Sequence, residues 1–382
     1  MDLTKNWIYL DYNASTPMDA EVLKAMEEAL RYQAHPSSPH PHGRGANAII
    51  EDAREKVAEA LHCQSREVIF NSGSTEASNH VIKGVSYSSS SNGEKKHFIT
   101  SCVDHAATLA PLRFLEKQGH ELTVLGVDKY ARIDPADLKK ALRAETVLVS
   151  LIHGQNEVGS IQPLEKIGAI CREHGTLFHI DASQSFGKIP VCVEALQADF
   201  LNIAGHKAYG PKGVGALFIR DGLELEPLLH GGGHESGWRS GTPAPQLIAG
   251  LGAACELVKK LGFVPPHSAK ELWTVLSSEL GERITRNGHP EKSLPNVLHV
   301  TFQGVDGRTL LNHAKVSAST GAACHSAALS PVLSAMDLTP EQTRGSVRLS
   351  CGRGTSLEDA KRAGIALVDA YRALLAEEGS ST

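Results

Sequence analysis

Short apolar runs rich in β-branched residues alternate with longer amphipathic segments along the first part of the chain. The apolar runs predict strands at 67–71, 97–101, 122–127, 146–152, 177–181, 200–203 and 213–219. The amphipathic segments between them predict helices, among them 75–85, 106–118, 135–142 and 164–174. Strands that alternate with helices indicate βα units and a mostly parallel sheet covered on both faces.

The pattern changes after about Pro243. It predicts two successive helices at 244–261 and 268–283, and then a strand, a helix, a strand and a terminal helix at 296–302, 308–314, 344–351 and 356–376. This order is typical of a separate α+β unit. We therefore expect an α/β protein with two domains: a large one over 16–255, and a small one formed by 1–15 and 256–382.

Length and charge narrow the function classes. A chain of 382 residues is longer than one hydrophobic core usually supports, which agrees with two domains. The formal net charge is -5 and no basic stripe is visible, so we expect no nucleic-acid partner. No apolar stretch approaches the roughly 20 residues that span a bilayer, so we expect no membrane partner.

The cysteines and the first residues point to a compartment. There are seven cysteines, an odd number, without a CxxC pair or a zinc-like spacing, which is typical of a reducing environment. Met1 to Tyr9 show neither a signal-peptide core nor an Arg-rich presequence. We expect a cytoplasmic protein. His35, His40 and His42 lie in a proline-rich tract that resembles a metal-binding one, but no nearby carboxylate or thiol completes a site, so no metal is expected.

Residues 71–76, Asn-Ser-Gly-Ser-Thr-Glu, follow a predicted strand and open a predicted helix. Free N–H groups at a helix start bind anions such as phosphate, and glycine allows close approach. Taken alone, these residues fit a capped turn without a ligand better than an anion site. A P-loop is not indicated, because the GxxxxGK[ST] spacing is absent.

Two further polar residues follow predicted strands. Asp181 ends the run 177–181, where it could bind a protonated pyridine nitrogen or simply close the strand with an Asx turn. Lys207 follows the run 200–203, where burial would lower its pKa, as lysines that form Schiff bases require. An ordinary surface lysine in a Gly/Pro turn fits Lys212 better. The ordered set of helix start, strand-end Asp and Lys suits a pyridoxal 5′-phosphate (PLP) enzyme.

Motifs across nearly the whole chain make a family resemblance specific. They are YLDYNASTP at 9–17, SGSTE at 72–76, NEVG at 156–159, DASQ at 181–184, GHK at 205–207, GGGHE at 231–235, RSGT at 239–242, GAAC at 321–324 and SCGR at 350–353. In this order they resemble the NifS-type cysteine desulfurase and selenocysteine lyase family of class V PLP enzymes. The resemblance implies PLP-dependent transferase fold type I.

The resemblance also implies roles for single residues. Lys207 would hold PLP as a Schiff base and move protons, and Asp181 would bind the pyridine nitrogen. His105 would stack on the ring and act as an acid or base. The remaining implied contacts are those of Gln184 and Asn156 with the ring oxygen, of Ser74, Thr75 and His206 with the phosphate, of Thr242 with the phosphate bound by a neighbouring subunit, and of Arg353 and Asn156 with the substrate.

Cys324 lies in a loop of small residues, where a thiol could be exposed, although a buried cysteine in a Gly-Ala turn would look the same. By the resemblance it takes sulfur from L-cysteine, or protonates selenium from L-selenocysteine, and leaves L-alanine. The sulfur would be carried as a persulfide to an acceptor protein. The resemblance further implies a homodimer with shared active sites.

Some positions depart from the family pattern. Ala204 stands where members often carry a phosphate-binding hydroxyl, and selenocysteine lyases tend to have an apolar residue there. His35 replaces a usual Asn, and Ser236 a usual Arg. These departures bear on the choice between sulfur and selenium. Two other functions remain open: a PLP-dependent aminotransferase or β-eliminating lyase, which needs no mobile cysteine, and a catalytically silent binding protein of the same fold.

Overall fold

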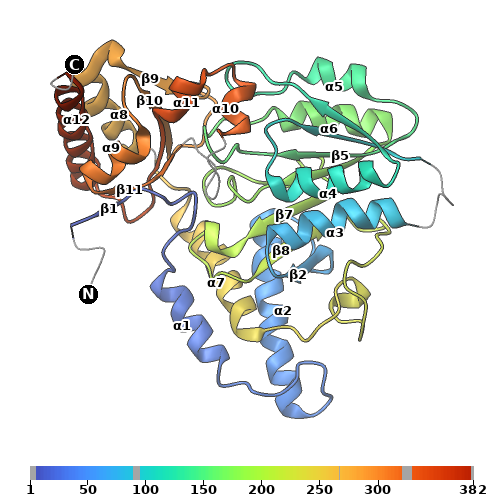
Figure 1. Ribbon diagram of the computed structural model, residues 1–382. Coiled ribbons are helices and arrows are strands. Elements are labelled where there is room, and N and C mark those ends of the chain that lie inside the picture. The colour runs from blue at the N-terminus through green and yellow to red at the C-terminus, as the bar shows by residue number, and fades with distance from the viewer. Residues whose placement is uncertain (1–5, 89–94, 266, 321–328, 380–382) are drawn as a thin grey trace.

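The computed structural model describes residues 6–88, 95–265, 267–320 and 329–379, and its main feature is a sheet of seven strands (Figure 1). The strands follow the order β2-β8-β7-β6-β5-β3-β4. Their bounds are Val68–Asn71 (β2), His97–Ser101 (β3), Glu121–Leu125 (β4), Thr146–Ile152 (β5), Leu177–Asp181 (β6), Phe200–Ala204 (β7) and Gly215–Ile219 (β8). Only β8 runs antiparallel to its neighbours, so the predicted mostly parallel sheet is confirmed.

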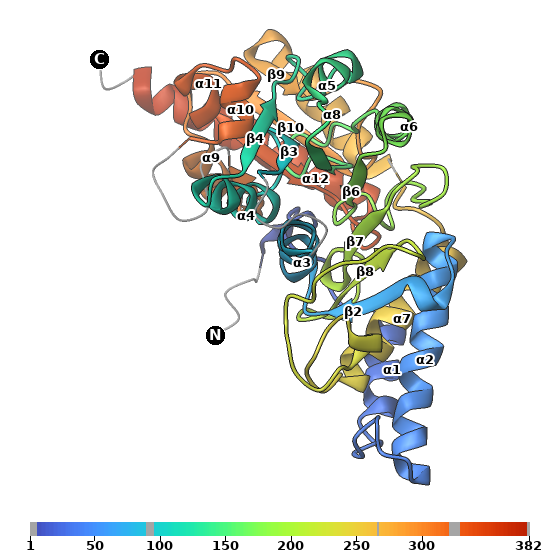
Figure 2. The same cartoon turned by 90° about the vertical axis from the view of Figure 1, so that its right-hand side faces the viewer.

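Helices cover both faces of this sheet. The helices of this part are α1 (Ala20–Ala29), α2 (Pro41–Leu61), α3 (Ser74–Tyr87), α4 (Ala106–Lys117), α5 (Pro135–Ala141), α6 (Leu164–His174) and α7 (Pro245–Leu261), of which α1 packs against α7. Figure 2 shows α3 and α4 on one side of the strands, with α2, α5 and α6 on the other. In β7, Phe200 packs with the α3 and α4 side chains, whereas Leu201 packs with those of α2 and α6. Because alternate side chains point to opposite faces, a strand buried on both faces is apolar throughout.

The C-terminal part forms an antiparallel sheet of four strands in the order β12-β13-β10-β9. The strands are β9 (Ile284–Asn287), β10 (Val297–Phe302), β12 (Ser319–Thr320) and β13 (Ser346–Ser350). The helices of this part are α8 (His267–Leu280), α9 (Gly307–Ala314), α10 (Pro331–Ala335), α11 (Pro340–Arg344) and α12 (Leu357–Gly379). The N-terminal strand β1 (Ile8–Tyr9) joins this part by pairing with β11 (Val316–Ser317).

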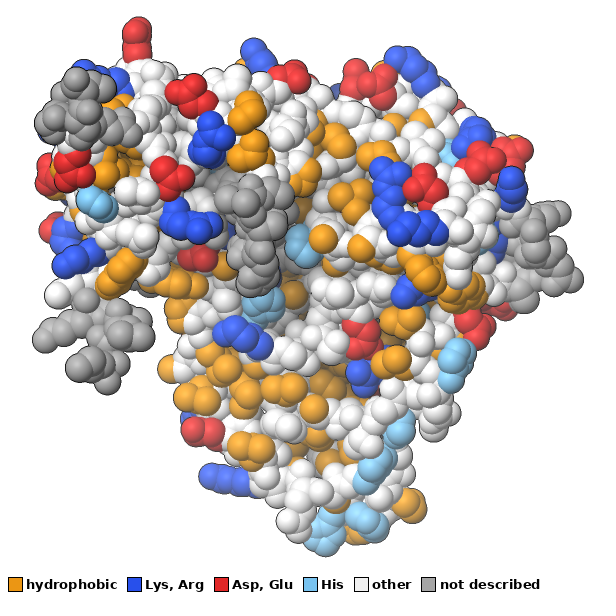
Figure 3. Space-filling model, viewed as in Figure 1, with side chains coloured by type: hydrophobic (Ala, Val, Ile, Leu, Met, Phe, Trp, Pro, Cys, Tyr) orange, Lys and Arg blue, Asp and Glu red, His pale blue; other side chains and the backbone are white. Residues whose placement is uncertain are grey.

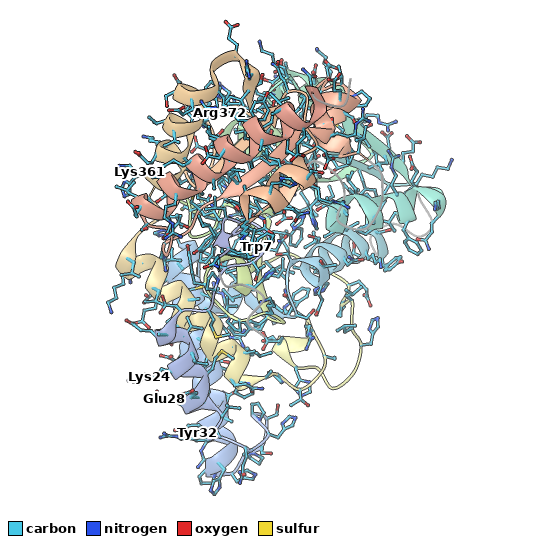
Figure 4. All side chains as sticks on the ribbon, turned by 60° about the vertical axis from the view of Figure 1, so that its left-hand side comes forward. Trp7, Lys24, Glu28, Tyr32, Lys361 and Arg372 are labelled. Carbon is cyan, nitrogen blue, oxygen red and sulfur yellow. The ribbon has the colours of Figure 1, made fainter. Side chains whose placement is uncertain are left out.

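Helices α8, α9 and α12 share one core with β10, in which Leu276, Leu310 and Leu367 are buried. On the surface, ion pairs join α12 to α8: Arg372 lies 2.8 Å from Glu279, and Lys361 lies 3.7 Å from the α8 residue Glu271. Figure 4 labels both cations on the outer side of this helix pair. The α+β character predicted for the C-terminal part is therefore present.

The division into domains remains a prediction. The predicted boundary between 255 and 256 falls within α7, which continues to Leu261 and packs against α1 and α2. The segment 1–15 was assigned to the small domain, and its strand β1 does pair with β11 there. None of the described helices combines the length and the apolarity that crossing a bilayer needs.

Candidate active site

A cavity of about 690 Å³ lies where several strands of the larger sheet end. Its walls include residues that follow the carboxyl ends of β2, β3, β5, β6 and β7. These five strands run in the same direction, so their carboxyl ends meet at one edge, the edge where α/β sheets bind ligands. Arg348 of β13 closes the cavity on the side of the smaller sheet, and Asp11 and residues 13–15 close it on the side of the N-terminal segment.

The start of α3 forms one end of the cavity. Gly73 precedes the helix with φ 137°, a conformation that suits glycine, and Ser74 and Thr75 begin the first turn. The first N–H groups of a helix have no partner within it. The Ser74 hydroxyl also accepts a hydrogen bond from the Ser183 hydroxyl at 2.5 Å. The predicted phosphate-binding pair therefore lines the cavity with the donors that an anion requires.

Asp181 ends β6 and is only 3% exposed. Its Oδ1 accepts hydrogen bonds from the Ser183 N–H and from Asn202 Nδ2, both at 2.9 Å. Asn202 is held in turn by His179, whose Nε2 lies 2.7 Å from Asn202 Oδ1. Burial lowers the pKa of His179 to about 4, so its neutral ring can donate here. The carboxyl group faces the cavity in a fixed orientation.

Lys207 lies in the short 3-10 turn η2 (Gly205–Lys207) that follows β7. Its Nζ donates to the carbonyl oxygens of Asn13 and Ala14, at 2.6 and 2.9 Å. Burial lowers the pKa of this amine to about 8, and the positive charge of Arg348 adds to the effect. An uncharged amine is the form that reacts with an aldehyde. Lys212 lines the same cavity.

The other predicted cofactor contacts within the subunit also line the cavity. His105 is exposed, and its Nδ1 caps α4 by accepting from the Ala107 N–H at 3.1 Å. Gln184 is 4% exposed, and its Nε2 donates to the Asn13 carbonyl at 2.8 Å. Burial and the charge of Lys207 lower the pKa of His206 to about 4. The cavity-lining residues from the prediction are Ser74, Thr75, His105, Asn156, Asp181, Gln184, His206 and Lys207.

The two arginines near the end of β13 lie in different surroundings. Arg353 is not among the residues that line the cavity; its guanidinium stacks over the Tyr209 ring at 4.6 Å, and its Nη2 lies 3.5 Å from the Gly262 carbonyl. Arg348 does line the cavity and is 8% exposed. The sequence reasoning did not single out Arg348. A charged residue inside an otherwise buried strand was the signal that could have identified it.

The contacts of Arg348 leave part of its guanidinium available. Its Nη2 donates to Asp11 at 2.8 Å and to Ser319 at 2.7 Å, and its Nη1 donates to the Asn156 carbonyl at 3.0 Å. Its Nε is buried and has no hydrogen-bond partner within the described part of the chain. Because Arg348 lines the cavity, its positive charge suits an anionic ligand there.

Thr242 lies elsewhere. Thr242 does not line the cavity; its hydroxyl lies 3.3 Å from Nε2 of His35, near the far end of α1. Its predicted role in a neighbouring subunit stays a prediction. Cys324 lies outside the described residues. Within those residues no group of three metal-ligating side chains is found, and the ring nitrogen Nδ1 of His40 caps α2.

Comparisons with known proteins agree with this geometry. Residues 8–362 match the family described as Aminotransferase class-V. A curated relative, the cysteine desulfurase IscS of Dictyoglomus turgidum, is 44% identical over 93% of this chain and 92% of its own length. The IscS of Methanosarcina thermophila is 40% identical over 93% of this chain and 89% of its own length.

Solved structures of other proteins share the fold of this chain. A NifS-like protein has a TM-score of 0.86 at 34% identity, over 95% of this chain and 98% of its own. SspA in complex with cysteine has a TM-score of 0.82 at 35% identity, over 90% of this chain and 98% of its own. The predicted fold type I, with the family resemblance on which it rested, is confirmed.

Proposed function

The chain belongs to the class-V aminotransferase family, and we propose that it is a cysteine desulfurase, which takes sulfur from L-cysteine and leaves L-alanine. Members of this family are PLP-dependent enzymes, so the predicted cofactor is confirmed. The observation that carries the proposal is the amine of Lys207, with its lowered pKa, in one cavity with the buried Asp181 carboxyl and the partly unpaired Arg348 guanidinium.

The residues around the cavity fit the cofactor. Lys207 would hold it covalently, Asp181 would bind its pyridine nitrogen, and Ser74, Thr75 and His206 would bind its phosphate. A cavity of about 690 Å³ suits a ligand of this size together with a small amino acid. When bound, PLP supplies an electron sink for the bonds at the substrate Cα.

The chain's own groups would orient the substrate and move its protons. Arg348, rather than the predicted Arg353, would bind the substrate carboxylate, because Arg348 lines the cavity, whereas the guanidinium of Arg353 stacks on Tyr209 outside it. Asn156 would contribute a polar contact beside it. The Lys207 amine would carry a proton to or from Cα, and His105 would serve as an acid or base at the open side.

Sulfur transfer would use Cys324, as the family resemblance implies. Its thiolate attacks the substrate sulfur, the bond between that sulfur and substrate Cβ breaks, and a proton replaces sulfur on Cβ. The products are L-alanine and a persulfide on Cys324, so sulfur, hydrogen and electrons balance without an added oxidant or reductant. With L-selenocysteine the same residues would give L-alanine, with Cys324 as a proton donor, and release of the selenium as selenide would take two electrons from an added thiol reductant.

We also propose a homodimer that works in the cytoplasm and passes sulfur to an acceptor protein. Thr242 lies outside its own subunit's cavity, as a residue supplied to a second copy should. Met18, Leu23 and Leu30, on and beside α1, are 41%, 49% and 65% exposed. Figure 3 shows hydrophobic side chains gathered over the part of the molecule where α1 and α7 lie. Such a patch suits contact with a second copy of the chain.

Turnover of L-cysteine and L-selenocysteine by wild type and by Cys324→Ala tests the proposal. We expect the variant to lose alanine formation from L-cysteine. Cys63→Ala is the matched control, because Cys63 is partly buried and does not line the cavity. Retained selenocysteine turnover would identify Cys324 as the residue that discriminates the two substrates, and equal loss would show that it serves both. Full cysteine turnover by Cys324→Ala would refute the sulfur-transfer step.

A further inference from the structure

Lys188 is a buried lysine that has no part in the chemistry proposed above. It lies between β6 and β7, is 3% exposed and does not line the cavity. Its Nζ donates to Gln184 Oε1 at 2.6 Å and to Asn13 Oδ1 at 3.0 Å. A buried amine destabilises a protein unless its hydrogens are bonded, so both contacts are needed where they are.

The two acceptors of Lys188 lead directly to the cavity. The Asn13 carbonyl accepts from Gln184 Nε2 at 2.8 Å and from Lys207 Nζ at 2.6 Å. Asn13 Oδ1 accepts a second hydrogen bond from Asn296 Nδ2 at 3.1 Å. Lys188, Gln184, Asn13 and Lys207 therefore form one continuous set of hydrogen bonds from the interior to the reactive amine.

The Asn13 carbonyl can only accept a hydrogen bond, and this fixes which way the Gln184 amide faces. With Oε1 toward Lys188, the amide nitrogen points to the Asn13 carbonyl and uses one of its two hydrogens there. The second hydrogen has no partner among the described residues and can be offered to the cavity. In the flipped amide, two oxygens would face each other at Asn13, and the hydrogen bond from Lys188 to Oε1 would be lost.

We propose that Lys188 is a positioning residue that holds the Gln184 amide so that its nitrogen, and not its oxygen, faces the cavity. Gln184 then donates a hydrogen bond to the ring oxygen of the cofactor. This inference rests on the proposed function, because it takes the cavity to be the cofactor site. Lys188 itself contacts neither cofactor nor substrate.

A double-mutant cycle tests this indirect action. Cofactor-free Lys188→Met, Gln184→Ala and the double variant are titrated with PLP, and the Kd and the visible absorption maximum are measured. Each single variant should raise the Kd on the order of tenfold, the effect of about one hydrogen bond to a charged acceptor. If Lys188 acts through Gln184, the double variant binds as Gln184→Ala does. If the Kd of the double variant instead rises about a hundredfold, as the product of two independent tenfold effects, the proposal is overturned.

Lys96→Met is the matched control. Lys96 is also buried, at 6% exposure, but it donates to the backbone carbonyls of Val85, Ser86 and Ser88 away from the cavity. Its loss should lower stability and leave the Kd and the absorption maximum unchanged. A shift in both by Lys96→Met would mean that losing any buried lysine produces the effect, and the proposal would fail.

Gln184→Glu provides a second test if Lys188→Met does not fold. The new carboxylate keeps an oxygen toward Lys188 but offers no donor to the cavity, so its Kd for PLP should rise at least as much as that of Gln184→Ala. Wild-type affinity in Gln184→Glu would overturn the proposal. A wild type that does not bind PLP would refute the proposed function instead, whereas a wild type and Lys188→Met with equal Kd values would refute only the role of Lys188.

Discussion

Arg348→Lys should weaken the binding of the substrate carboxylate while the cavity keeps its positive charge. In the structure, the guanidinium already bonds Asp11, Ser319 and the Asn156 carbonyl, and its Nε has no partner among the described residues. A planar guanidinium can satisfy these groups and a carboxylate at once. A lysine ammonium is a point charge with three hydrogens and cannot hold the same geometry.

The expected magnitude follows from the bonds that are lost. One hydrogen bond between charged groups contributes about 1.5–3 kcal/mol, which corresponds to a decrease in kcat/KM of about 10- to 150-fold. Because the carboxylate does not react, its contact stabilises the bound substrate and the transition state alike. The loss should therefore raise KM and leave kcat nearly unchanged. Initial rates of alanine formation over a range of L-cysteine concentrations measure both constants.

Arg353→Lys is the matched comparison, since Arg353 stacks on Tyr209 outside the cavity. We expect this variant to keep the wild-type KM. The reasoning would be refuted if Arg353→Lys raised KM and Arg348→Lys did not, because the substrate carboxylate would then bind where the sequence motif first indicated.

Three further predictions follow from other contacts. Uptake of PLP by the cofactor-free protein should accelerate as pH rises through about 8, because burial favours the free amine of Lys207; acceleration only above pH 10 would contradict this. Glu235→Gln removes a buried ion pair of 2.7 Å with Arg54 and should lower the free energy of unfolding in urea by about 3–5 kcal/mol; a loss below about 1 kcal/mol would contradict it. Gly352→Ala would place a Cβ 2.0 Å from the Tyr12 ring and should lower the free energy of unfolding by about 1–3 kcal/mol. An unchanged midpoint of urea unfolding would argue against this close packing.

The central strands could be predicted from the sequence because burial on both faces leaves a continuous apolar run. The predicted bounds of β3, β5 and β6 are those of the structure. Helices α1 and α2 were not predicted. In α2 the capping residue is His40, which is not a usual cap, and Gly43 lowers helix propensity. A Cβ at Gly43 would lie 2.2 Å from the Ser38 carbonyl, so this glycine lets the loop before α2 pack closely against the first turn of the helix.

The site was predictable to the extent that its residues follow strand ends in order. Asp181 and Lys207 are of this kind, and both line the cavity. Arg348 was not predicted because its place in the cavity depends on contacts distant in sequence, such as that with Asp11, 337 positions away. A motif places Arg353 near the site, but only the folded chain shows that its guanidinium turns to Tyr209.

The products formed from L-cysteine test the central claim most directly. The purified protein, loaded with PLP, is incubated with L-cysteine and a thiol reductant, and alanine, pyruvate and sulfide are quantified, with Lys207→Ala as the inactive control. A desulfurase yields alanine and sulfide in equal amounts, with pyruvate no higher than in the control. Pyruvate as the main product would identify a β-eliminating lyase and contradict the account.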